Sequence, residues 1–600
     1  MKMKLCDLLI KLKNGFCFDT ETAGKTPGDA LKIHSLTLVG ISFAVTPFEA
    51  YYLPLPKNRQ EALEILSQIE PVFSDPTIPK TGHNLKYDIS VLRRYDILVR
   101  GNLFDTMIAH YLCYPDERHG LKHLSKELLN YTQIEISDLI GKGKYQRSMQ
   151  DISIREVCDY ACEDADQTLQ LKQILKPLLK SKGLTSLFES VECPLINVLA
   201  DMEYTGIRVD PNKLKEISNQ INNELIQIQE QLDDLSGIKG FNPRSTKKLS
   251  NLLFDTLGLE SISTTKSGNR STSKQVLTKL KHEHPIIKQI LNYKSLSSLK
   301  SSFMGSLIAK IHPITGRVHT SFRQATVVTG RLSSSNPNIQ NIPKTEGLGK
   351  QIRKAFVPRD ENHILIAADY SQIELRVMAH LSKDPAMIEA FNTGVDIHLA
   401  TASKIFNTPV EKIDKDGVER KIAKTVNFGL NYLMSAKSLA DRISEATSKE
   451  VSVGTAQDYM DKYFEEFKGV EQFQDDAYFF AVEHGYAETM FGRRRVVKEI
   501  DSPLSYKRMA ARRIAVNTPI QGTAADIIKM AMVKLHKELS SKGLQSKIVL
   551  QIHDELVLEV PKSEVDIVFP LIRDVMENIV TLDVPLVVDI NTGNNWLEAH

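Results

Sequence analysis

The spacing of apolar and polar residues changes near position 180. Before it, short apolar runs rich in β-branched and aromatic residues alternate with Gly, Pro, Thr and Asp, which predicts strands at Phe16–Phe18, Leu36–Val45 and Tyr51–Leu53. After it, apolar residues recur at helical spacing over long stretches such as Val191–Tyr204 and Leu214–Leu235. The pattern predicts an α/β chain of several domains, with a sheet first and long helices after it.

A strand pattern returns near the C-terminus. In Lys547–Val560, KIVLQIHDELVLEV, two apolar runs flank the polar trio HDE at 553–555, which predicts a β-hairpin with the trio on its turn. A solvated turn is the simplest interpretation. However, the apolar run Ile364–Ala368 also ends at an acid, Asp369, 185 residues upstream of Asp554. A carboxylate at the tip of a buried strand is costly unless it is paired or binds a metal, so this second acid weakens the interpretation of a simple solvated turn.

Composition narrows the classes of function. With 600 residues, 42% hydrophobic and 25% charged, the chain is long enough for about three or four globular domains. The net charge is only +2, so a nucleic-acid surface must be a local patch. Six cysteines form no zinc spacing, which indicates reduced thiols and an intracellular protein. No apolar run is long enough for a membrane span, and the basic N-terminus lacks a cleavage site and is expected to lead directly into the first strand.

Four acids and a tyrosine in the first 180 residues are spaced for metal chemistry. Asp19 and Glu21 are two apart in a predicted strand and therefore share one face. Asp88 stands at a turn-to-helix junction, and Tyr160 and Asp164 share one face of a predicted helix. Each acid alone would be a solvated residue or a helix cap. The order DxE, NxxxD, YxxxD favours paired carboxylates around a cation, because buried like charges repel.

FDTET, NLKYD and YACEDAD resemble the three motifs of the DEDDy 3′→5′ proofreading exonuclease domain, which has an RNase H-like fold. The resemblance implies that two divalent metal ions are held by four acids and that Tyr160 orients the attacking water. The implied ligands are Asp19, Glu21, Asp88 and Asp164. No member of this set is missing, so we expect an active nuclease.

The segment Gly237–Lys300 is strongly basic. It contains 12 Lys and Arg residues but only three acids, a local excess of nine positive charges. A charge run is usually a solvated face, but this excess in a near-neutral chain favours phosphate binding. The loop Thr264–Ser273 adds glycine and small hydroxyl side chains. The segment resembles the thumb of family A DNA polymerases.

The sequence DYSQIELR, at Asp369–Arg376, resembles motif A of the same family. The resemblance implies that Asp369 is a metal ligand and that Arg376 supports the structure. It also implies that Glu374 blocks a 2′-hydroxyl and so selects deoxynucleotides, with Gln372 in the same nucleotide site.

RKIAKTVNFGLNY spaces Arg420, Lys424, Phe428 and Tyr432 by four, which predicts that they share one helical face. Two cations followed by two aromatics can neutralise a triphosphate and stack on a base, whereas the alternative is an amphipathic helix with two aromatics in the core. The segment resembles the family's fingers helix RxxxKxxxFGxxY. This implies that Arg420 and Lys424 hold the β- and γ-phosphates and that Tyr432 guards the templating position.

Two residues near this helix bear on the resemblance. His398, in DIHLATA, matches a family histidine that contacts the triphosphate. Leu433 departs from the family, in which Gly usually follows the Tyr, and a bulkier residue there would alter fidelity or the hinge of the fingers.

Three segments supply further candidate contacts with DNA. TGRLSSSNPNIQNIP is too rich in Ser, Asn and Pro for a helix or central strand; it is either an ordinary surface loop or, by resemblance, the family's loop beside the primer terminus. RRIAVNTPIQGTAADIIK resembles the family's minor-groove reader. Pro519 interrupts the helical hydrogen-bond ladder there, which weakens the expectation that Arg513, Asn517 and Gln521 share one face. TMFGRRR resembles a structural or template-facing fingers element. The candidate DNA-binding residues are Arg331, Asn338, Gln340, Arg513, Asn517, Gln521 and His553.

The resemblance extends from Phe16 to Trp596 with its motifs in family order. It predicts an α/β multidomain protein: an RNase H-like exonuclease domain (1–180), a helical thumb (181–303), an antiparallel-sheet palm in two parts (304–380 and 506–600) and helical fingers between them (381–505). The exonuclease begins within the first twenty residues, so no 5′-nuclease domain is expected.

The implied activity is template-directed DNA synthesis from a primer 3′-hydroxyl with proofreading, in replication or repair. Asp369 and Asp554 would act with two Mg²⁺ per active site, with Mn²⁺ as a substitute, and Glu555 would be auxiliary. The expected partners are primer–template DNA and deoxynucleoside triphosphates. The protein is expected to be a monomer without a membrane partner, cytoplasmic and nucleoid-associated, with an organellar owner left open.

Two rival functions remain at this point. A single-subunit RNA polymerase would share the palm chemistry, but Glu374 argues against it. A nuclease or DNA-binding protein with a degenerate polymerase half is opposed by the presence of every expected polymerase carboxylate.

Overall fold

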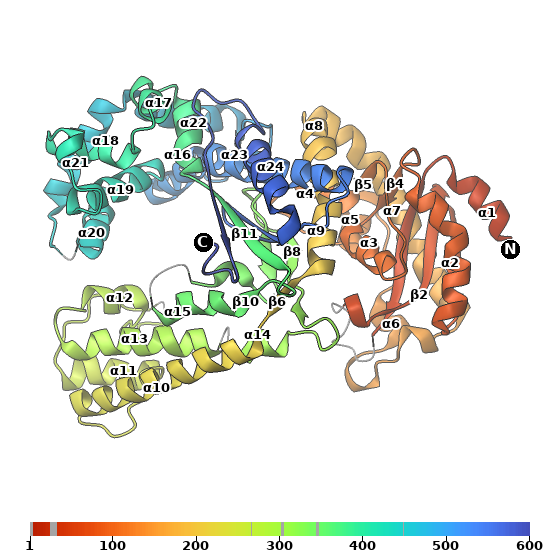
Figure 1. Cartoon of the computed structure of the whole chain (residues 1–600), viewed down its shortest axis with the longest axis horizontal. Coiled ribbons are helices and arrows are strands. Elements are labelled where there is room, and N and C mark those ends of the chain that lie inside the picture. The colour runs from red at the N-terminus through yellow and green to blue at the C-terminus, as the bar shows by residue number, and fades with distance from the viewer. Residues whose placement is uncertain (1–3, 25–32, 266, 302–304, 344–346, 448) are drawn as a thin grey trace.

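The structure is a computed structural model that describes residues 4–24, 33–265, 267–301, 305–343, 347–447 and 449–600 (Figure 1). Lys266, in the basic segment, and the predicted thumb–palm boundary at 303–304 lie outside the described residues. An N-terminal sheet domain lies beside a larger body in which a helical arm, a sheet and a second group of helices follow one another.

The N-terminal domain is built on a five-stranded mixed sheet of order β3-β2-β1-β4-β5. Strand β1 is antiparallel to β2 and parallel to β4, which matches the expected RNase H-like fold. The strands are β1 (Phe16–Ala23), β2 (Thr37–Thr46), β3 (Glu49–Pro54), β4 (Lys80–Gly82) and β5 (Leu103–Asp105). The helices are α1 (Leu5–Leu12), α2 (Arg59–Ser74), α3 (Leu85–Arg93), α4 (Thr106–Cys113), α5 (Leu121–Leu129), α6 (Ile136–Ile140) and α7 (Ile154–Ser181).

The three strands predicted in this domain are confirmed, but the expectation for the N-terminus is wrong. The chain does not lead directly into the first strand, because helix α1 precedes it. Leu8 and Leu12 lie one turn apart on that helix and are buried, so a short amphipathic pattern beside basic residues forms a helix that packs on the domain.

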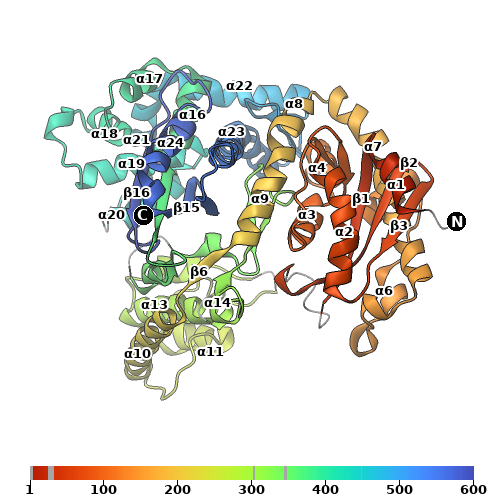
Figure 2. The same cartoon turned by 45° about the vertical axis from the view of Figure 1, so that its right-hand side comes forward.

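A shared helix joins this domain to the rest of the molecule (Figure 2). After α8 (Thr185–Leu187) and a π-helical turn (Phe188–Glu192), α9 (Cys193–Thr205) runs between the two bodies. Ile196 on α9 packs in the N-terminal core, whereas Leu195 and Leu199 pack in the larger core that extends through the C-terminal body. A single helix therefore forms part of both cores.

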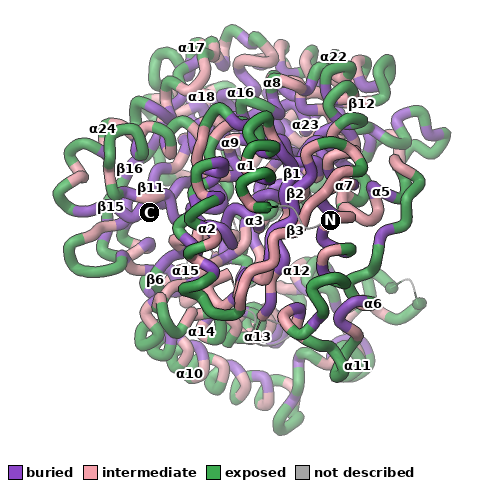
Figure 3. The backbone as a smooth tube through the Cα atoms, turned by 90° about the vertical axis from the view of Figure 1, so that its right-hand side faces the viewer, coloured by how far each residue is buried: buried purple, intermediate pink, exposed green. Residues whose placement is uncertain are grey.

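The basic segment belongs to a helical arm with a separate small core. Ile228 and Leu232 on the longest helix of the arm pack with Ile287 and Ile290 of another. The elements are β6 (Ile207–Val209), α10 (Pro211–Ser236), α11 (Thr246–Ser250), a π-helical turn (Asn251–Thr256), α12 (Lys274–Lys279), α13 (Pro285–Leu299) and α14 (Gly305–Ala309). The predicted helices Val191–Tyr204 and Leu214–Leu235 are confirmed within a few residues. Figure 3 shows buried stretches of β1 and β2, intermediate burial along β3, and exposed residues interspersed with buried ones along α10.

The central sheet has four antiparallel strands in the order β14-β15-β11-β16. These are β11 (His363–Tyr370), β14 (Lys547–Ile552), β15 (Glu555–Pro561) and β16 (Val588–Gly593), and they pack against α23 (Ser505–Ser541) and α24 (Val565–Glu577). The predicted hairpin is confirmed: Ile552 pairs with Glu555 around a turn in which His553 has φ +56°. The trio is divided, however, because Glu555 is the first residue of the strand and not part of the turn.

A group of helices is inserted between β11 and α23. They are α16 (Ile373–Ser382), α17 (Pro385–Asn392), α18 (Ile397–Phe406), α19 (Val418–Asn431), α20 (Ala436–Thr447), α21 (Val453–Glu466) and α22 (Lys468–His484), followed by the two-stranded hairpin β12 (Tyr486–Glu488) and β13 (Arg494–Val496). Helix α23 continues through Pro519, so Arg513, Asn517 and Gln521 lie on one continuous helix. A proline removes one hydrogen bond, and here the residues on either side are buried in the core, which holds the helix through it.

The remaining short elements lie between the arm and the sheet. They are β7 (Arg317–Val318), β8 (Ser321–Arg323), β9 (Ser333–Ser335), α15 (Leu348–Gln351) and β10 (Phe356–Val357). As predicted, 329–343 has no helix longer than a 3₁₀ turn and no central strand among its residues. Across the described ranges, we find no helix with the length and apolar character needed to cross a membrane.

Two candidate active sites

The structure brings the N-terminal acids together around β1. Asp19 and Glu21 on β1 and Asp164 on α7 have carboxylate oxygens within 4.8 Å of one another. Asp88, in the first turn of α3, accepts hydrogen bonds from Thr20 N at 3.0 Å and Thr20 Oγ1 at 2.6 Å. These acids come from three elements far apart in sequence, and the strand and helix spacing that predicted shared faces is observed.

The electrostatics of this cluster favour a bound cation. Burial, reinforced by Asp164, raises the pKa of Glu21 to about 8. Burial also raises the pKa of Asp88 to about 7, against the opposing hydrogen bonds from Thr20. Glu21 Oε1 is buried and has no hydrogen-bond partner among the described residues. Desolvated carboxylates that repel one another are the oxygen ligands that hard divalent ions prefer, so the residues fit such ions.

Other side chains complete a pocket of about 380 Å³ at the cluster. Tyr160 lines it, as do Lys122 and His123 from α5. Lys122 Nζ lies 5.2 Å from the centre of the Tyr160 ring, and Gln133 Nε2 donates to Asp164 Oδ1 at 2.6 Å. Sequence reasoning missed Lys122 and Gln133, because nothing in their local spacing marks them as neighbours of the acids.

The raised pKa values make the metal-free protein sensitive to pH. A carboxyl whose folded pKa exceeds its unfolded value contributes stability that is complete below the unfolded pKa and is lost as the pH rises through the folded pKa. We therefore expect the melting temperature in EDTA to fall from about pH 5 to about pH 8, and to fall less for Glu21→Gln. Mg²⁺ should raise it more at the higher pH, where the carboxylates are ionised. Equal pH dependence of the two chains would contradict this prediction.

A second acidic site lies at the end of the central sheet. Asp369 on β11 pairs in register with Glu555 on β15, and Tyr370 N donates to Asp554 O at 3.2 Å. Asp369 and Asp554 are thus at the same end of adjacent strands, and both are half-buried. The fold therefore brings these two acids, 185 residues apart in the sequence, to neighbouring strand ends.

Glu555 is placed differently from the expectation that it would be presented on the turn. Its side chain is fully buried, and its Oε1 accepts a hydrogen bond from Trp596 Nε1 at 2.7 Å. The guanidinium of Arg353, also fully buried, lies 4.2 Å from the Trp596 ring. Glu555 therefore anchors the C-terminal segment to the sheet beneath the site. Arg353 was missed by sequence reasoning, which had no signal for a contact with Trp596.

Glu374 and Arg331, predicted for the nucleotide and the primer, are ion-paired with each other. Burial raises the pKa of Glu374 to about 7, with Arg331 opposing the shift and Asp554 adding to it. The pair is thus adjacent to the acids of the sheet. Arg376 donates to Ser371 O at 2.9 Å and to Pro585 O, in agreement with the structural role expected for it. Gln372, half-buried, has φ +55° and immediately precedes α16.

Helix α19 carries Arg420, Lys424 and Phe428 on one face, but it ends at Asn431, so Tyr432 follows the helix and does not continue it. Arg420 Nη2 lies 2.7 Å from Asp396 Oδ2, whereas Lys424 is exposed. His398 is buried, and its Nδ1 lies 2.9 Å from Asn427 Nδ2. In this conformation, Lys424 is the more accessible of the two predicted phosphate ligands.

The residue that departs from the family lies in the turn that ends this helix. Leu433 has φ +51°, and the bonds Met434 N to Gly429 O (3.0 Å) and Leu433 N to Leu430 O (3.1 Å) form a Schellman turn. The left-handed position in this turn favours glycine, because a Cβ there costs about 1–2 kcal/mol.

Leu433→Gly should therefore raise the melting temperature, although the greater freedom of glycine in the unfolded chain offsets about half of the gain. Leu433→Val should lower it, since a β-branched side chain fits the left-handed region poorly. Thermal melts of the parent and the two variants would rank their melting temperatures. A Leu433→Gly chain that melts below Leu433→Val would contradict the left-handed position assigned to this residue.

The other predicted DNA contacts are distributed over three elements. Arg513, Asn517 and Gln521 lie on successive turns of α23, with Arg513 exposed and the other two half-buried. Asn338 Oδ1 accepts from Ser334 Oγ at 2.9 Å, and Gln340 Nε2 donates to Gln551 Oε1 at 3.0 Å, which connects the 329–343 loop to β14. His553 is exposed on the turn of the hairpin.

Known protein families and relatives match both parts of the chain. A sequence profile of DNA polymerase family A matches residues 211–598, and a 3′-5′ exonuclease profile matches residues 3–180. DNA polymerase I of Pseudomonas aeruginosa is 42% identical over 594 residues, covering 97% of this chain and 63% of the relative. DNA polymerase I of Chloroflexus aurantiacus is 40% identical over 607 residues, covering 99% of this chain and 62% of the relative. The solved POL domain of Pol1 from M. smegmatis, in complex with DNA primer-template and dNTP, has a TM-score of 0.87 at 32% identity and covers 100% of this chain and 99% of its own.

This chain spans about three fifths of the length of the curated relatives that it matches. The expected fold class is confirmed, with an exonuclease domain followed by a polymerase domain of mixed helices and sheet. The polymerase profile alone covers well over half of the chain, and the protein belongs to DNA polymerase family A.

Proposed function

We propose that this protein is a DNA-directed DNA polymerase that extends a primer 3′-hydroxyl and proofreads its product with a 3′→5′ exonuclease. The observation that carries the proposal is the meeting of Asp369 and Asp554 at one end of the central sheet, beside the Glu374–Arg331 pair. The separate cluster of Asp19, Glu21 and Asp164 supports the second activity.

The proposed polymerase and exonuclease activities imply a division of the chain into subdomains. We take 1–180 as the exonuclease domain, 181–303 as the thumb, 304–380 with 506–600 as the palm, and 381–505 as the fingers. The separate core of the α10–α13 arm supports a thumb that packs as its own unit, and the palm sheet draws its strands from both of the palm segments.

In the polymerase site, Asp369 and Asp554 would hold two divalent ions. When bound, these ions would activate the primer hydroxyl and stabilise charge on the departing pyrophosphate. Lys424 and Arg420 would bind the triphosphate, His398 would support it, and Phe428 and Tyr432 would stack near the base pair. Glu374, held by Arg331, would occupy the space that a ribose 2′-hydroxyl needs, with Gln372 in the same site.

The side chains that face the primer and template would read shape and not sequence. Arg513, Asn517 and Gln521 on α23 offer hydrogen-bond donors for the minor-groove acceptors that every correct base pair presents. The remaining contacts would fix the backbone near the primer end. These are Arg331, Asn338, Gln340 and His553.

In the exonuclease site, Asp19, Glu21, Asp88 and Asp164 would hold the metal ions. Tyr160 would orient the attacking water, and its ring is held beside Lys122 at the edge of the pocket. The proposed ion at both sites is Mg²⁺, with Mn²⁺ as a substitute. We further propose that the partners are primer–template DNA and deoxynucleoside triphosphates, and that the chain acts as a cytoplasmic, nucleoid-associated monomer with no membrane partner.

A primer-extension assay with a labelled primer tests this function. With Mg²⁺ and deoxynucleotides, the chain should extend a matched primer to the template end and remove a mismatched 3′ nucleotide first. Ribonucleotides should be used poorly. Efficient extension with ribonucleotides alone would favour the RNA polymerase alternative, and no extension at all would favour a nuclease with a degenerate polymerase half.

Glu374→Ala should relax the choice of sugar. Removing one excluding contact in a packed site changes discrimination by about 1–3 kcal/mol, so relative ribonucleotide use should rise by roughly tenfold or more. Glu374→Gln keeps the size of the side chain and should retain most of the discrimination. Competition between deoxy- and ribonucleotides measures the discrimination of both variants. Unchanged discrimination in Glu374→Ala would show that Glu374 does not contact the sugar.

A further inference from the structure

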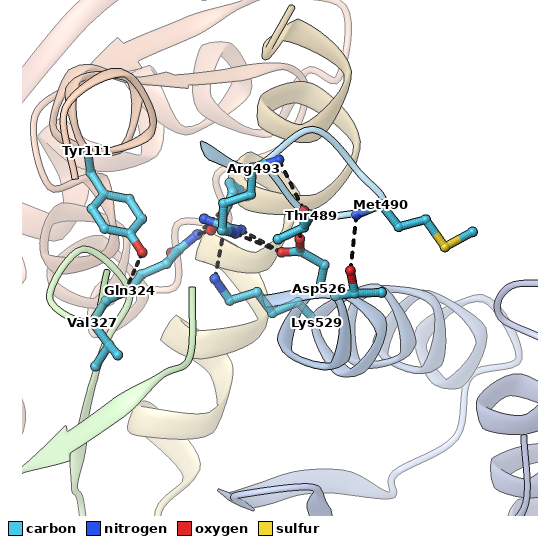
Figure 4. Close-up of polar contacts among 10 residues, drawn as sticks. Tyr111, Gln324, Val327, Thr489, Met490, Arg493, Asp526 and Lys529 are labelled. Carbon is cyan, nitrogen blue, oxygen red and sulfur yellow. Dashed lines mark hydrogen bonds and ion pairs between the residues drawn. The ribbon is translucent and has the colours of Figure 1, made fainter. Parts of the chain in front are cut away.

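The basic hairpin β12–β13, with the turn between its strands, contains the most buried arginine of the segment 381–505. Arg493 is 2% exposed, and its guanidinium contacts Glu192 and Asp526. Nε and Nη2 donate to Asp526 Oδ1 at 2.9 Å and 2.7 Å. Figure 4 shows Arg493 between α23 and the π-helical turn that precedes α9.

The buried charges around Arg493 are balanced. Lys529 Nζ donates to Glu192 Oε1 at 2.8 Å, so two cations meet two carboxylates. Burial alone would raise the pKa of Glu192, but Lys529 and Arg493 lower it to about 2. Removing one partner from such a group would leave an uncompensated buried charge, which is strongly destabilising, so the four side chains are held together.

Two glycines place this hairpin against the elements that carry predicted DNA contacts. A Cβ on Gly330 would lie 2.5 Å from Arg493 Nε. A Cβ on Gly522 would lie 2.4 Å from Thr489 Cγ2. The residue after Gly330 is Arg331, which pairs with Glu374, and the residue before Gly522 is Gln521.

Hydrogen bonds hold the hairpin against α23 and hold the loop before Arg331 against the N-terminal domain. Thr489 Oγ1 donates to Asp526 Oδ2 at 3.0 Å, and Met490 N donates to Thr523 Oγ1 at 3.0 Å, which ties the hairpin to α23 (Figure 4). The loop before Arg331 is held by Tyr111 of the exonuclease domain, whose hydroxyl donates to Val327 O at 2.7 Å.

We propose that the hairpin is a positioning element of the polymerase site. Arg493 and Thr489 set the spacing between Arg331 and Gln521 through close contact with Gly330 and Gly522, and so determine how accurately the primer end is read. This role rests on the proposed function, since it needs a primer end to read.

A rescue experiment tests the contact at Gly522. The full chain carries Asp19→Ala and Glu21→Ala, so that proofreading does not mask mispaired ends, and the ratio of kcat/KM for matched over mismatched primers is measured. Gly522→Ala should lower this ratio by about tenfold or more, since small displacements near a reacting centre have large effects on rate. Thr489→Ser removes the Cγ2 methyl but keeps the hydroxyl, so adding it to Gly522→Ala should restore most of the ratio.

Two further variants separate positioning from folding. Gly454→Ala on α21 is the matched control, because a Cβ there meets nothing closer than Ser452 Oγ at 3.7 Å, and its ratio should be unchanged. Arg493→Lys keeps the charge but cannot span both carboxylates, and it should lower the ratio in a chain that still melts cooperatively.

The outcomes distinguish the two proposals. If the parent chain does not extend a matched primer, the proposed function is wrong. If the parent extends and Gly522→Ala keeps the ratio, or if Thr489→Ser fails to restore it, the positioning role is wrong.

Discussion

Asp554→Ala should abolish primer extension while leaving degradation of single-stranded DNA intact. Asp554 is on the turn between β14 and β15, and its partner Asp369 ends the adjacent strand. Losing one of two ligands of the proposed ions removes several kcal/mol of transition-state stabilisation, so the loss in kcat should be roughly 10³-fold or more. The exonuclease acids lie on β1, α3 and α7 of another domain, and the substitution touches none of them. Initial rates on matched primer–template and on a labelled single strand would measure the two activities separately.

The chain offers a matched control for this prediction. Asp589 on β16 pairs in register with Asp369 from the other side and is exposed. Asp589→Asn should therefore leave extension close to that of the parent chain. Loss of both activities in Asp554→Ala would overturn the division into two sites. A similar loss of extension in Asp589→Asn would mean that the acids of the site were wrongly chosen.

The sequence predicted these acids as site residues because each of them belongs to a local pattern. Asp19 and Glu21 are two apart in a strand, and Tyr160 and Asp164 are four apart in a helix, so spacing alone placed each pair on a face. Asp369 and Asp554 each follow an apolar run. The short-range sequence pattern does not show that the two runs become neighbouring strands.

The expectations that were weak or wrong depended on tertiary packing. Pro519 made a shared face for Arg513, Asn517 and Gln521 less certain from the sequence, whereas burial of the surrounding turns keeps the helix continuous. Glu555 looked like its neighbour Asp554 in the sequence, whereas the strand register turns it toward Trp596, 41 residues later. Lys122, Gln133 and Arg353 approach the two sites from other elements, and short-range spacing contains no information about such contacts.

Leu433 occupies a position at which the family usually has glycine. The sequence marked it as a departure from a family glycine but did not reveal its consequence. The structure supplies the reason: the residue occupies the left-handed position of the turn that ends α19, a position at which glycine is least strained. The departure from glycine therefore strains the backbone at the end of α19, directly after Tyr432.

Asp19→Ala combined with Glu21→Ala should stop the removal of a mismatched 3′ nucleotide while primer extension continues. The two carboxylates lie in one cluster with Asp164, and removing both leaves too few ligands for two ions. The rate of mismatch removal should fall by roughly 10³-fold or more, by the same loss of charge stabilisation that applies at the other site. Single-turnover excision from a mismatched primer, without nucleotides, would measure it.

The matched control for the exonuclease prediction is Asp166→Asn. Asp166 is two residues from Asp164 on α7, but its Oδ1 accepts from Phe48 N at 2.6 Å, so it belongs to a contact between α7 and the β2–β3 turn and not to the acidic cluster. Excision should continue in this variant. Unchanged excision in the double variant would show that Asp19 and Glu21 do not hold the catalytic ions. Excision lost equally in Asp166→Asn would instead locate the sensitivity in the packing of α7, since that helix carries both Tyr160 and Asp164 into the pocket.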